Sequence, residues 1–311
     1  MIRTQLKLFP EETKKDQTQK TIRIRQSSSL NIRDWNETVS LIAKNFSTSD
    51  RRYYAGMTDG DGHISLRSYS GRSECYKYKT RNGNPGGKRL KKLVMQLQLR
   101  HDHAEPILKL GEIFDLTISK VFPLVKKNTQ PSLRIEISGM KVKLFLFSIY
   151  PYLLEKKEEA RAMLRELDCP EEHLPRDRHF SFEYLAGFTD AEGCIVFKLV
   201  HEKTKIGNVT SSYKMYYQLS NNDKAQLQFL KKNLIDLGFN HFRKDTTSTY
   251  ENVKKSKGRN PEKWKPTTHI YLGGTPNQLT KFYKNIEPFI LIKHKKDKIL
   301  ATMQYSDIIN R

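Results

Sequence analysis

Residues 53–64 read YYAGMTDGDGHI, and residues 184–195 read YLAGFTDAEGCI. Seven of the twelve positions are identical, and Glu192 stands opposite Asp61, so a carboxylate is kept at that position. A stretch that recurs once at this length predicts that the chain contains two copies of one structural unit.

Further landmarks support the duplication because they recur in the same order after each copy. They are Gln98-Leu99 with Gln218-Leu219, the helical patterns Ile107, Leu110, Phe114 with Leu227, Leu230, Leu234, and the segment Tyr150–Lys156 with Glu287–Lys293. The spacing of the apolar residues in the second landmark predicts a helix with one face on a core.

In each copy, the hydrophobic pattern predicts a helix, two strands, a helix, two strands and a helix. The fold class expected is therefore α/β of the mixed α+β kind, with two pseudo-symmetric αββαββα repeats and antiparallel sheets. The second pair of strands is expected near 118–126 with 133–138, and near 241–245 with 268–273. The expected division is an N-terminal extension over 1–45, a first repeat over 46–166, a linker over 167–180 and a second repeat over 181–311.

The net charge indicates the class of partner. The chain has 311 residues with 56 Lys and Arg against 34 Asp and Glu, which gives a net charge of +22. A surplus of this size, spread along the chain, favours a polyanion as partner. Since no apolar run approaches the ~20 residues that span a bilayer, we expect nucleic acid rather than a membrane.

The three cysteines do not suggest a structural framework. Cys75, Cys169 and Cys194 are far apart and odd in number, with no CxxC pair. The sequence therefore predicts neither disulfides nor a zinc knuckle.

The repeated stretch itself reads as a short helix of about two turns. Asp50 and Ser181 are suited to N-cap the two helices, and Gly62 and Gly193 to follow their ends. Each helix also carries small residues along one side, namely Ala55, Gly56 and Gly60 in one copy and Ala186, Gly187 and Ala191 in the other. Such faces allow two helix backbones to approach closely, so we expect the two helices to pack against each other.

If these helices pack side by side, Asp61 and Glu192 emerge together at their C-terminal ends, where the helix dipole is already negative. Two adjacent anions repel, and a divalent cation with a preference for oxygen ligands, such as Mg²⁺, would relieve the repulsion. The alternative is that the two carboxylates only solvate helix ends, and the duplication of the motif favours the metal site.

The nonapeptides Tyr54–Gly62 and Leu185–Gly193 resemble the LAGLIDADG signature of homing endonucleases, in the single-chain form that carries two motifs. The resemblance implies that Asp61 and Glu192 bind the metal and the scissile phosphates. It implies that Lys156 and Lys293 organise the attacking water or stabilise the leaving side. It also places a water-ordering polar residue at His101 and Asn221.

The same resemblance implies a monomer whose two sheets form a saddle on double-stranded DNA. Its activity would be site-specific, metal-dependent hydrolysis of one phosphodiester in each strand, at a long and asymmetric target. The residues expected to contact bases or phosphates are Arg67, Gln96, Gln98, Arg100, Lys198, Lys214 and Gln218.

Two alternatives remain open from the sequence. Some proteins of this kind are RNA maturases that assist splicing of their host intron, and others are non-catalytic DNA-binding regulators. The resemblance also implies an organellar setting, in a mitochondrion or chloroplast, ahead of an archaeal cytoplasm.

Overall fold

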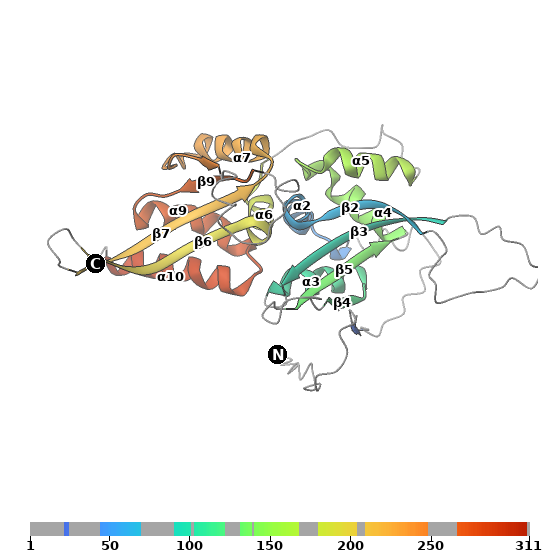
Figure 1. The fold of residues 1–311 in the computed structure, drawn as a ribbon, viewed down its shortest axis with the longest axis horizontal. Coiled ribbons are helices and arrows are strands. Elements are labelled where there is room, and N and C mark those ends of the chain that lie inside the picture. The colour runs from blue at the N-terminus through green and yellow to red at the C-terminus, as the bar shows by residue number, and fades with distance from the viewer. Residues whose placement is uncertain are drawn as a thin grey trace, which may run out of the picture.

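The computed structural model describes residues 22–24, 44–69, 90–100, 103–121, 131–138, 140–167, 180–203, 209–247 and 266–309. These residues form two halves of similar construction that lie side by side (Figure 1). The predicted fold class is confirmed, since each half combines helices with an antiparallel sheet.

The first half follows the expected order, and its last helix is followed by a 3-10 turn and a further helix. Its elements are α2 (Thr48–Asp61), β2 (His63–Tyr69), β3 (Leu90–Arg100), α3 (Glu105–Phe114), β4 (Ile118–Val121), β5 (Ser132–Ser138), α4 (Met140–Ile149), the 3-10 helix η2 (Tyr150–Tyr152) and α5 (Lys157–Glu166).

The second half repeats that order. Its elements are α6 (Phe182–Glu192), β6 (Gly193–Lys203), β7 (Val209–Asn221), α7 (Lys224–Asp236), β8 (Thr246–Thr247), β9 (Thr268–Leu272), α9 (Pro276–Ile286), the 3-10 helix η5 (Glu287–Phe289) and α10 (Lys293–Ile309).

The two sheets share one topology. The strand order is β2-β3-β5-β4 in the first and β6-β7-β9-β8 in the second, and all pairs are antiparallel. The first sheet has one more edge strand, β1 (Ile22–Ile24), which pairs with β4. A short part of the N-terminal extension thus belongs to the sheet of the first repeat.

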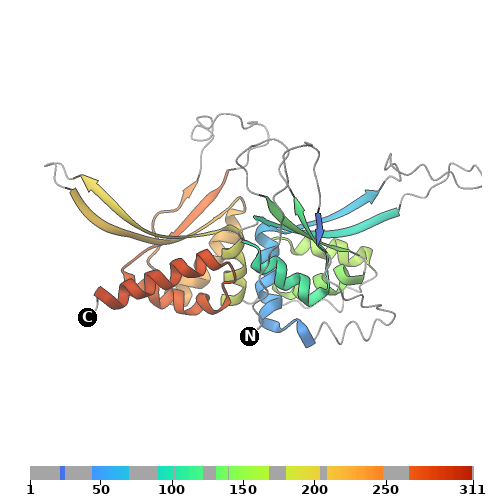
Figure 2. The same ribbon diagram turned by 90° about the horizontal axis from the view of Figure 1, so that it is seen from below.

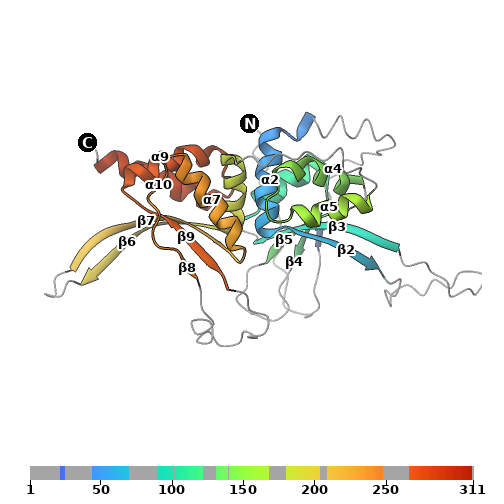
Figure 3. The same ribbon diagram turned by 90° about the horizontal axis from the view of Figure 1, so that it is seen from above.

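The helices cover one face of both sheets and leave the other face open. Figures 2 and 3 show the helices on one side of the molecule and the strands on the other, with the outer ends of β2–β3 and β6–β7 bending away from the helices. The open face that the two sheets present together is therefore concave.

The core lies between the sheets and the helices, because alternate residues of each strand point to the helical side. Met95, Leu97, Leu99, Leu133, Ile135 and Ile137 are buried there in the first half, and Ile195, Tyr217, Leu219, Ile270 and Leu272 in the second. The helical patterns expected from the sequence also face this core, since Ile107, Leu110, Phe114, Leu227, Leu230 and Leu234 are all buried.

Two expectations about the motif helices are corrected. Ser47, not Asp50, is the N-cap of α2, because Ser47 has an extended backbone and its Oγ accepts from the Asp50 amide at 3.1 Å. Ser181 caps α6 as expected by accepting from the Tyr184 amide. The helices have 14 and 11 residues, which is longer than two turns.

The weaker strands are only partly as expected. In place of a strand over 241–245, the structure has one isolated bridge between Phe242 and Leu272, and the short strand β8 lies further along the chain. Two irregular backbone bonds explain the difference: the Arg243 amide donates to the Tyr271 carbonyl, and the Gly273 amide donates to the His241 carbonyl. Most of the long segment expected as a loop over 246–267, and most of the linker over 167–180, lies outside the described residues.

Candidate functional site

The centre of the molecule is the contact between α2 and α6, which lie side by side where the two halves meet (Figures 1 and 3). A Cβ atom on Gly56 would overlap the carbonyl oxygen of Tyr184, and a Cβ on Gly187 would overlap that of Tyr53. Because each glycine faces the backbone of the other helix, the helices approach more closely than any side chain would allow. The close packing predicted from the small residues is confirmed.

Both helices end abruptly at a glycine. The Gly62 amide donates to the Thr58 carbonyl and the Gly193 amide to the Thr189 carbonyl, and the backbone then turns into an extended conformation. A Cβ on Gly62 would lie 2.5 Å from the Thr58 carbonyl oxygen, so close approach rather than backbone freedom requires glycine here. Asp61 and Glu192 are consequently the last helical residues of α2 and α6.

The helix contact brings Asp61 and Glu192 to one place. A Cβ on Gly60, the neighbour of Asp61, would lie 3.2 Å from Cγ of Glu192. Burial raises the pKa of Asp61 to about 6, against the lowering effect of Lys295 and Lys156. Burial and the charge of Asp61 raise the pKa of Glu192 to about 7, against Lys156 and Lys295. The two carboxylates therefore interact as like charges in a partly desolvated site.

Two lysines bind the ends of the same helices. Lys156 Nζ donates to the carbonyl oxygens of Thr58 and Asp59 at 2.8 Å and of Gly60 at 3.3 Å. Lys295 Nζ donates to the carbonyl oxygens of Thr189 at 2.7 Å and Asp190 at 2.9 Å. A cation at this position satisfies the free carbonyls and opposes the negative end of the helix dipole.

Lys293, unlike Lys156, does not bind the end of its motif helix. Lys293 is exposed and forms an ion pair with Asp297 at 2.6 Å, one turn along α10. Lys156 and Lys293 each stand five positions after a proline, Pro151 and Pro288. Only three residues separate η5 from α10, whereas four separate η2 from α5, and Lys295 reaches the helix end from inside the first turn of α10. In the first half, Lys156 immediately precedes α5.

Asn221 lies at the end of β7, against the first half. Its Nδ2 donates to Glu155 Oε2 at 3.1 Å and to Gln226 Oε1 at 2.8 Å, and its Oδ1 accepts from the Asp223 amide. Asn221 therefore contacts the residue that precedes Lys156.

His101 lies outside the described residues. His103, from the first half, instead contacts the residue that precedes Lys295: its ring stacks on that of His294 with 4.5 Å between the ring centroids. In both halves, the residue that precedes the lysine at the helix end, Glu155 or His294, therefore contacts a residue of the opposite half.

The carboxylates of Asp61 and Glu192 suit a hard divalent cation whose remaining ligands come from a substrate and from water. Within the described residues, no three His, Cys, Asp or Glu side chains form a cluster that could hold a metal by themselves. Mg²⁺ needs only one or two protein carboxylates where phosphate and water oxygens complete its shell. Asp61 and Glu192 supply two carboxylates whose mutual repulsion a divalent cation would remove.

The open face of the first sheet carries the expected polar row on β3. Gln96 is buried, with 8% of its surface exposed, and its Nε2 donates to Glu136 Oε2 at 3.0 Å. Gln98 and Arg100 are exposed, and Gln98 is held by Ser132 and by Arg134, whose Nε donates to Gln98 Oε1 at 3.0 Å.

Arg67 lies opposite Lys92 in the β2–β3 register, and its side chain is outside the described set. In the first half, Arg134 is therefore a cation of the open face that the sequence did not single out.

The open face of the second sheet is more aromatic. Lys198 and Lys214 pair across β6 and β7 and are exposed, while Gln218 Nε2 bonds Ser220 Oγ at 3.0 Å and His269 Nδ1 at 3.2 Å. The Nζ of Lys214 and the guanidinium of Arg243 each lie 5.7 Å from the Tyr216 ring centre.

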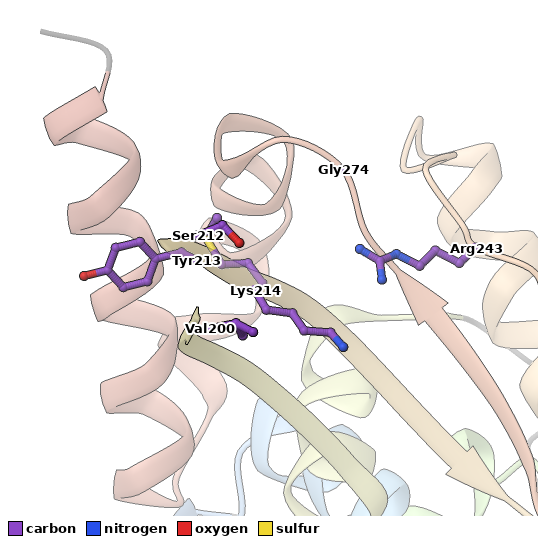
Figure 4. A pocket seen from close by; sticks show the side chains of 7 residues that line it. Val200, Ser212, Tyr213, Lys214, Arg243 and Gly274 are labelled. Atoms are coloured by element: carbon purple, nitrogen blue, oxygen red, sulfur yellow. The ribbon is translucent and has the colours of Figure 1, made fainter. Parts of the chain in front are cut away.

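Lys214 and Arg243 extend into one hollow, lined also by Val200, Ser212 and Gly274 (Figure 4). Sequence reasoning missed Arg243 because it lies in an irregular segment among many other cations.

Within the part of the chain that the structure describes, none of the helices has the length and apolar character needed to cross a membrane.

Comparison with known proteins gives the fold. No protein-family model and no curated protein sequence matches the chain. Among solved structures, the chain is similar to the LAGLIDADG meganuclease I-AabMI bound to uncleaved DNA, with a TM-score of 0.51 at 11% identity over 84% of this chain and 91% of that chain. It is also similar to the LAGLIDADG meganuclease I-CpaMI bound to uncleaved DNA, with a TM-score of 0.50 at 13% identity over 84% of this chain and 92% of that one. The chain has the LAGLIDADG meganuclease fold across most of its length.

Proposed function

We propose that this chain is a site-specific endonuclease of the LAGLIDADG homing type that hydrolyses one phosphodiester in each strand of a DNA duplex. The observation that carries the proposal is the meeting of Asp61 and Glu192 at the ends of α2 and α6, with Lys156 and Lys295 bound to the same helix ends. Two carboxylates that can hold a divalent metal and two cations that can offset developing charge suit metal-assisted cleavage of a phosphodiester.

DNA is the proposed partner for three reasons. The net charge of +22 favours a polyanion. The open faces of the two sheets carry amides and cations suited to base edges and phosphates, including Gln98, Arg134, Lys198, Lys214 and Arg243. The two solved structures with the same fold are DNA complexes.

The target is proposed to be asymmetric. Counted from the matching Gln98 and Gln218, Gln96 and Arg100 on β3 stand where β7 has Tyr216 and Ser220. Since base edges are read by the donors and acceptors that face them, the two halves would read different half-sites.

In the proposed mechanism, the carboxylates bind metal and the lysines stabilise developing negative charge. Asp61 and Glu192 would hold divalent metal, and such a metal when bound activates water and shields the leaving oxygen. Lys156 and Lys295 are fixed by the helix carbonyls beside those carboxylates and place positive charge where negative charge grows during attack on the phosphate.

The test begins with a duplex selected from a randomised library by cleavage with the wild-type chain in Mg²⁺. We expect Asp61→Asn and Glu192→Gln to lower double-strand cleavage by at least about a hundredfold while leaving the affinity for the selected duplex largely unchanged. Asp297→Asn removes an exposed carboxylate on α10 and is the matched control, for which cleavage at the wild-type rate is expected. Undiminished cleavage by either site variant would remove that carboxylate from the mechanism.

A further inference from the structure

Each motif helix carries a second aspartate, two residues before the candidate metal ligand. Asp59 and Asp190 are each only 1% exposed. Burial raises the pKa of both carboxyl groups, and hydrogen bonds from the protein oppose that shift. A buried carboxylate that accepts several hydrogen bonds fixes the position of the groups that donate them.

The donors to Asp59 are backbone amides of the segment that carries Lys156. The Leu154 amide donates to Asp59 Oδ2 at 2.7 Å, and the Lys156 amide donates to Asp59 Oδ1 at 2.9 Å. Asp59 thus holds the backbone from which Lys156 reaches the end of α2.

Asp190 does the same in the second half. The amides of Leu291 and Ile292 donate to Asp190 Oδ2 at 2.8 Å and 3.2 Å. The Lys295 amide in turn donates to the Ile292 carbonyl at 3.0 Å, so the segment held by Asp190 leads directly into the turn that carries Lys295.

The third partner of each aspartate comes from the opposite half. Tyr184 Oη donates to Asp59 Oδ2 at 2.7 Å, and Tyr53 Oη donates to Asp190 Oδ2 at 2.7 Å. Both tyrosines are buried, which raises the pKa of each hydroxyl well above its ordinary value and keeps it protonated as a donor. The two hydrogen bonds cross between α2 and α6 in opposite directions.

We propose that Tyr53 and Tyr184 are positioning residues that act across the boundary between the halves. The Tyr53 hydroxyl orients Asp190 and through it Lys295, whereas the Tyr184 hydroxyl orients Asp59 and through it Lys156. With one lysine assigned to the phosphodiester of each strand, each tyrosine controls the cleavage of one DNA strand, and the two control different strands. This inference rests on the proposed function, because it concerns the lysines assigned to cleavage.

The crossing explains why the hydroxyls matter beyond stability. A lysine displaced by about 1 Å from a phosphate under attack loses much of its effect on the rate. The Tyr184 hydroxyl also accepts from Gln226 Nε2 at 2.9 Å, and Gln226 is linked through Asn221 to Glu155, which belongs to the same Lys156 segment. Because the contacts of each hydroxyl lead to the segment of one lysine, its loss disturbs one side of the active site. A merely structural role would slow both strands alike.

The test compares Tyr53→Phe and Tyr184→Phe, each of which removes one oxygen without opening a cavity. Tyr54→Phe is the matched control, since its Oη is also buried but donates to the Pro106 carbonyl within the first half. The selected duplex is labelled on either strand, and the nicking rate of each strand is measured in Mg²⁺. We expect Tyr53→Phe to slow one strand by roughly tenfold or more and Tyr184→Phe to slow the other, with the unaffected strand within about twofold of wild type.

Three outcomes overturn the proposal. They are equal slowing of both strands by each variant, slowing of the same strand by both variants, and a strand bias in Tyr54→Phe as large as that in Tyr53→Phe. Should Tyr53→Phe fail to fold, Asp190→Asn keeps the shape of the site and carries the same test, with bias toward the same strand expected.

A second readout is independent of DNA cleavage. Hydrogen exchange of the Leu291 and Ile292 amides should accelerate in Tyr53→Phe, and that of the Leu154 and Lys156 amides in Tyr184→Phe. If the wild-type chain cleaves no duplex, the proposed function fails and this exchange pattern alone decides the positioning. Equal protection of both segments in the two variants would then overturn it.

Discussion

Lys156 and Lys295 bind the ends of the two motif helices in the same way, one from each half of the chain. Lys156 Nζ donates to three carbonyl oxygens at the end of α2, and Lys295 Nζ donates to two at the end of α6. Burial lowers the pKa of Lys295, while Asp190, Asp61 and Glu192 oppose that shift. This relationship identifies the equivalent lysines of the two halves without reference to sequence spacing.

The first prediction separates Lys295 from Lys293. Lys295→Met should lower the cleavage rate by about a hundredfold, because the charge beside Asp61 and Glu192 is lost. Lys293→Met should cleave as wild type does, since Lys293 is exposed and paired with Asp297. The measurement is single-turnover cleavage of the selected duplex, with thermal melting to confirm that both variants are folded. A larger loss in Lys293→Met than in Lys295→Met would restore the assignment made from the spacing.

The second prediction concerns pH and stability in the absence of metal. The pKa of Asp61 rises from 3.8 to about 6 on folding, so the folded protein binds a proton more tightly than the unfolded chain does. The part of the free energy of unfolding that this proton contributes is fully present below the pKa of the carboxyl group in the unfolded chain, 3.8. It is lost as pH rises through the pKa of that group in the folded protein, about 6. Asp61→Asn should therefore raise the melting temperature at about pH 8 and leave it unchanged at about pH 4.

Melting curves of the metal-free protein across this pH range give the measurement. Asp297→Asn again serves as control, because that carboxylate is exposed and paired with Lys293, and its melting temperature should follow wild type. A gain in Asp61→Asn that is the same at both pH values would show that the carboxylate charge is not the cause.

The architecture of each half could be predicted because it depends on local patterns. Leu227, Leu230 and Leu234 recur at helical spacing and are buried, and Gly62 and Gly193 end the motif helices. The proximity of Asp61 and Glu192 could be predicted because α2 and α6 each carry a row of small residues on one side, and the backbones of such helices can approach closely.

The structure differs from the predictions for residues whose contacts depend on the backbone path and on which atoms a side chain can reach. Lys293 has the spacing from Pro288 that Lys156 has from Pro151, yet Lys295 is the residue that reaches the helix carbonyls. Only three residues separate η5 from α10, whereas four separate η2 from α5, so the two lysines at equal spacing differ in their place on the fold. Ser47 and Asp50 are equally suited to cap a helix, and only the backbone conformation decides between them.

The tyrosine–aspartate bonds across the halves were not found for a related reason. Tyr53 and Asp190 are 137 positions apart, and no periodicity relates residues so distant in the chain. Their only signal was the identity of both residues in the two motif copies.

The third prediction tests the helix contact. Gly56→Ala should lower the free energy of unfolding by at least about 3 kcal/mol, because the new methyl group would overlap the Tyr184 backbone and the helices must separate. Gly187→Ala should behave in the same way against Tyr53. Urea denaturation monitored by circular dichroism gives the values.

Gly111→Ala in α3 is the control for these glycine substitutions. Its Cβ would meet Cδ1 and Cγ1 of the Ile118 side chain at 3.0 and 3.3 Å, which a side-chain shift of a few tenths of an ångström relieves, whereas a Cβ on Gly56 would lie 2.0 Å from a backbone oxygen. Alanine is also favoured over glycine inside a helix by about 1 kcal/mol, so little net change is expected. A loss in Gly111→Ala equal to that in Gly56→Ala would mean that close approach of α2 and α6 is not what the glycines provide.

The fourth prediction concerns Arg243 on the open face of the second sheet. Its guanidinium lies over the Tyr216 ring and extends into the hollow that Lys214 also lines. The contact with the ring limits the motion of the guanidinium, and a positioned guanidinium is suited to bind guanine or phosphate through its N–H groups. Arg243→Gln should therefore weaken binding of the selected duplex by about tenfold and reduce the slope of log affinity against log salt by about one.

The measurement is fluorescence anisotropy of the labelled duplex over a series of salt concentrations, without divalent metal so that no strand is cut. Lys232→Gln removes the same charge from an exposed position on α7, on the helical side of the molecule away from the open face (Figure 3). Its affinity and salt slope should equal those of wild type, because counterions are released only where a cation meets a phosphate. Equal weakening by the two substitutions would mean that net charge alone drives binding, and the open face of the second sheet would lose its assignment as the surface that contacts DNA.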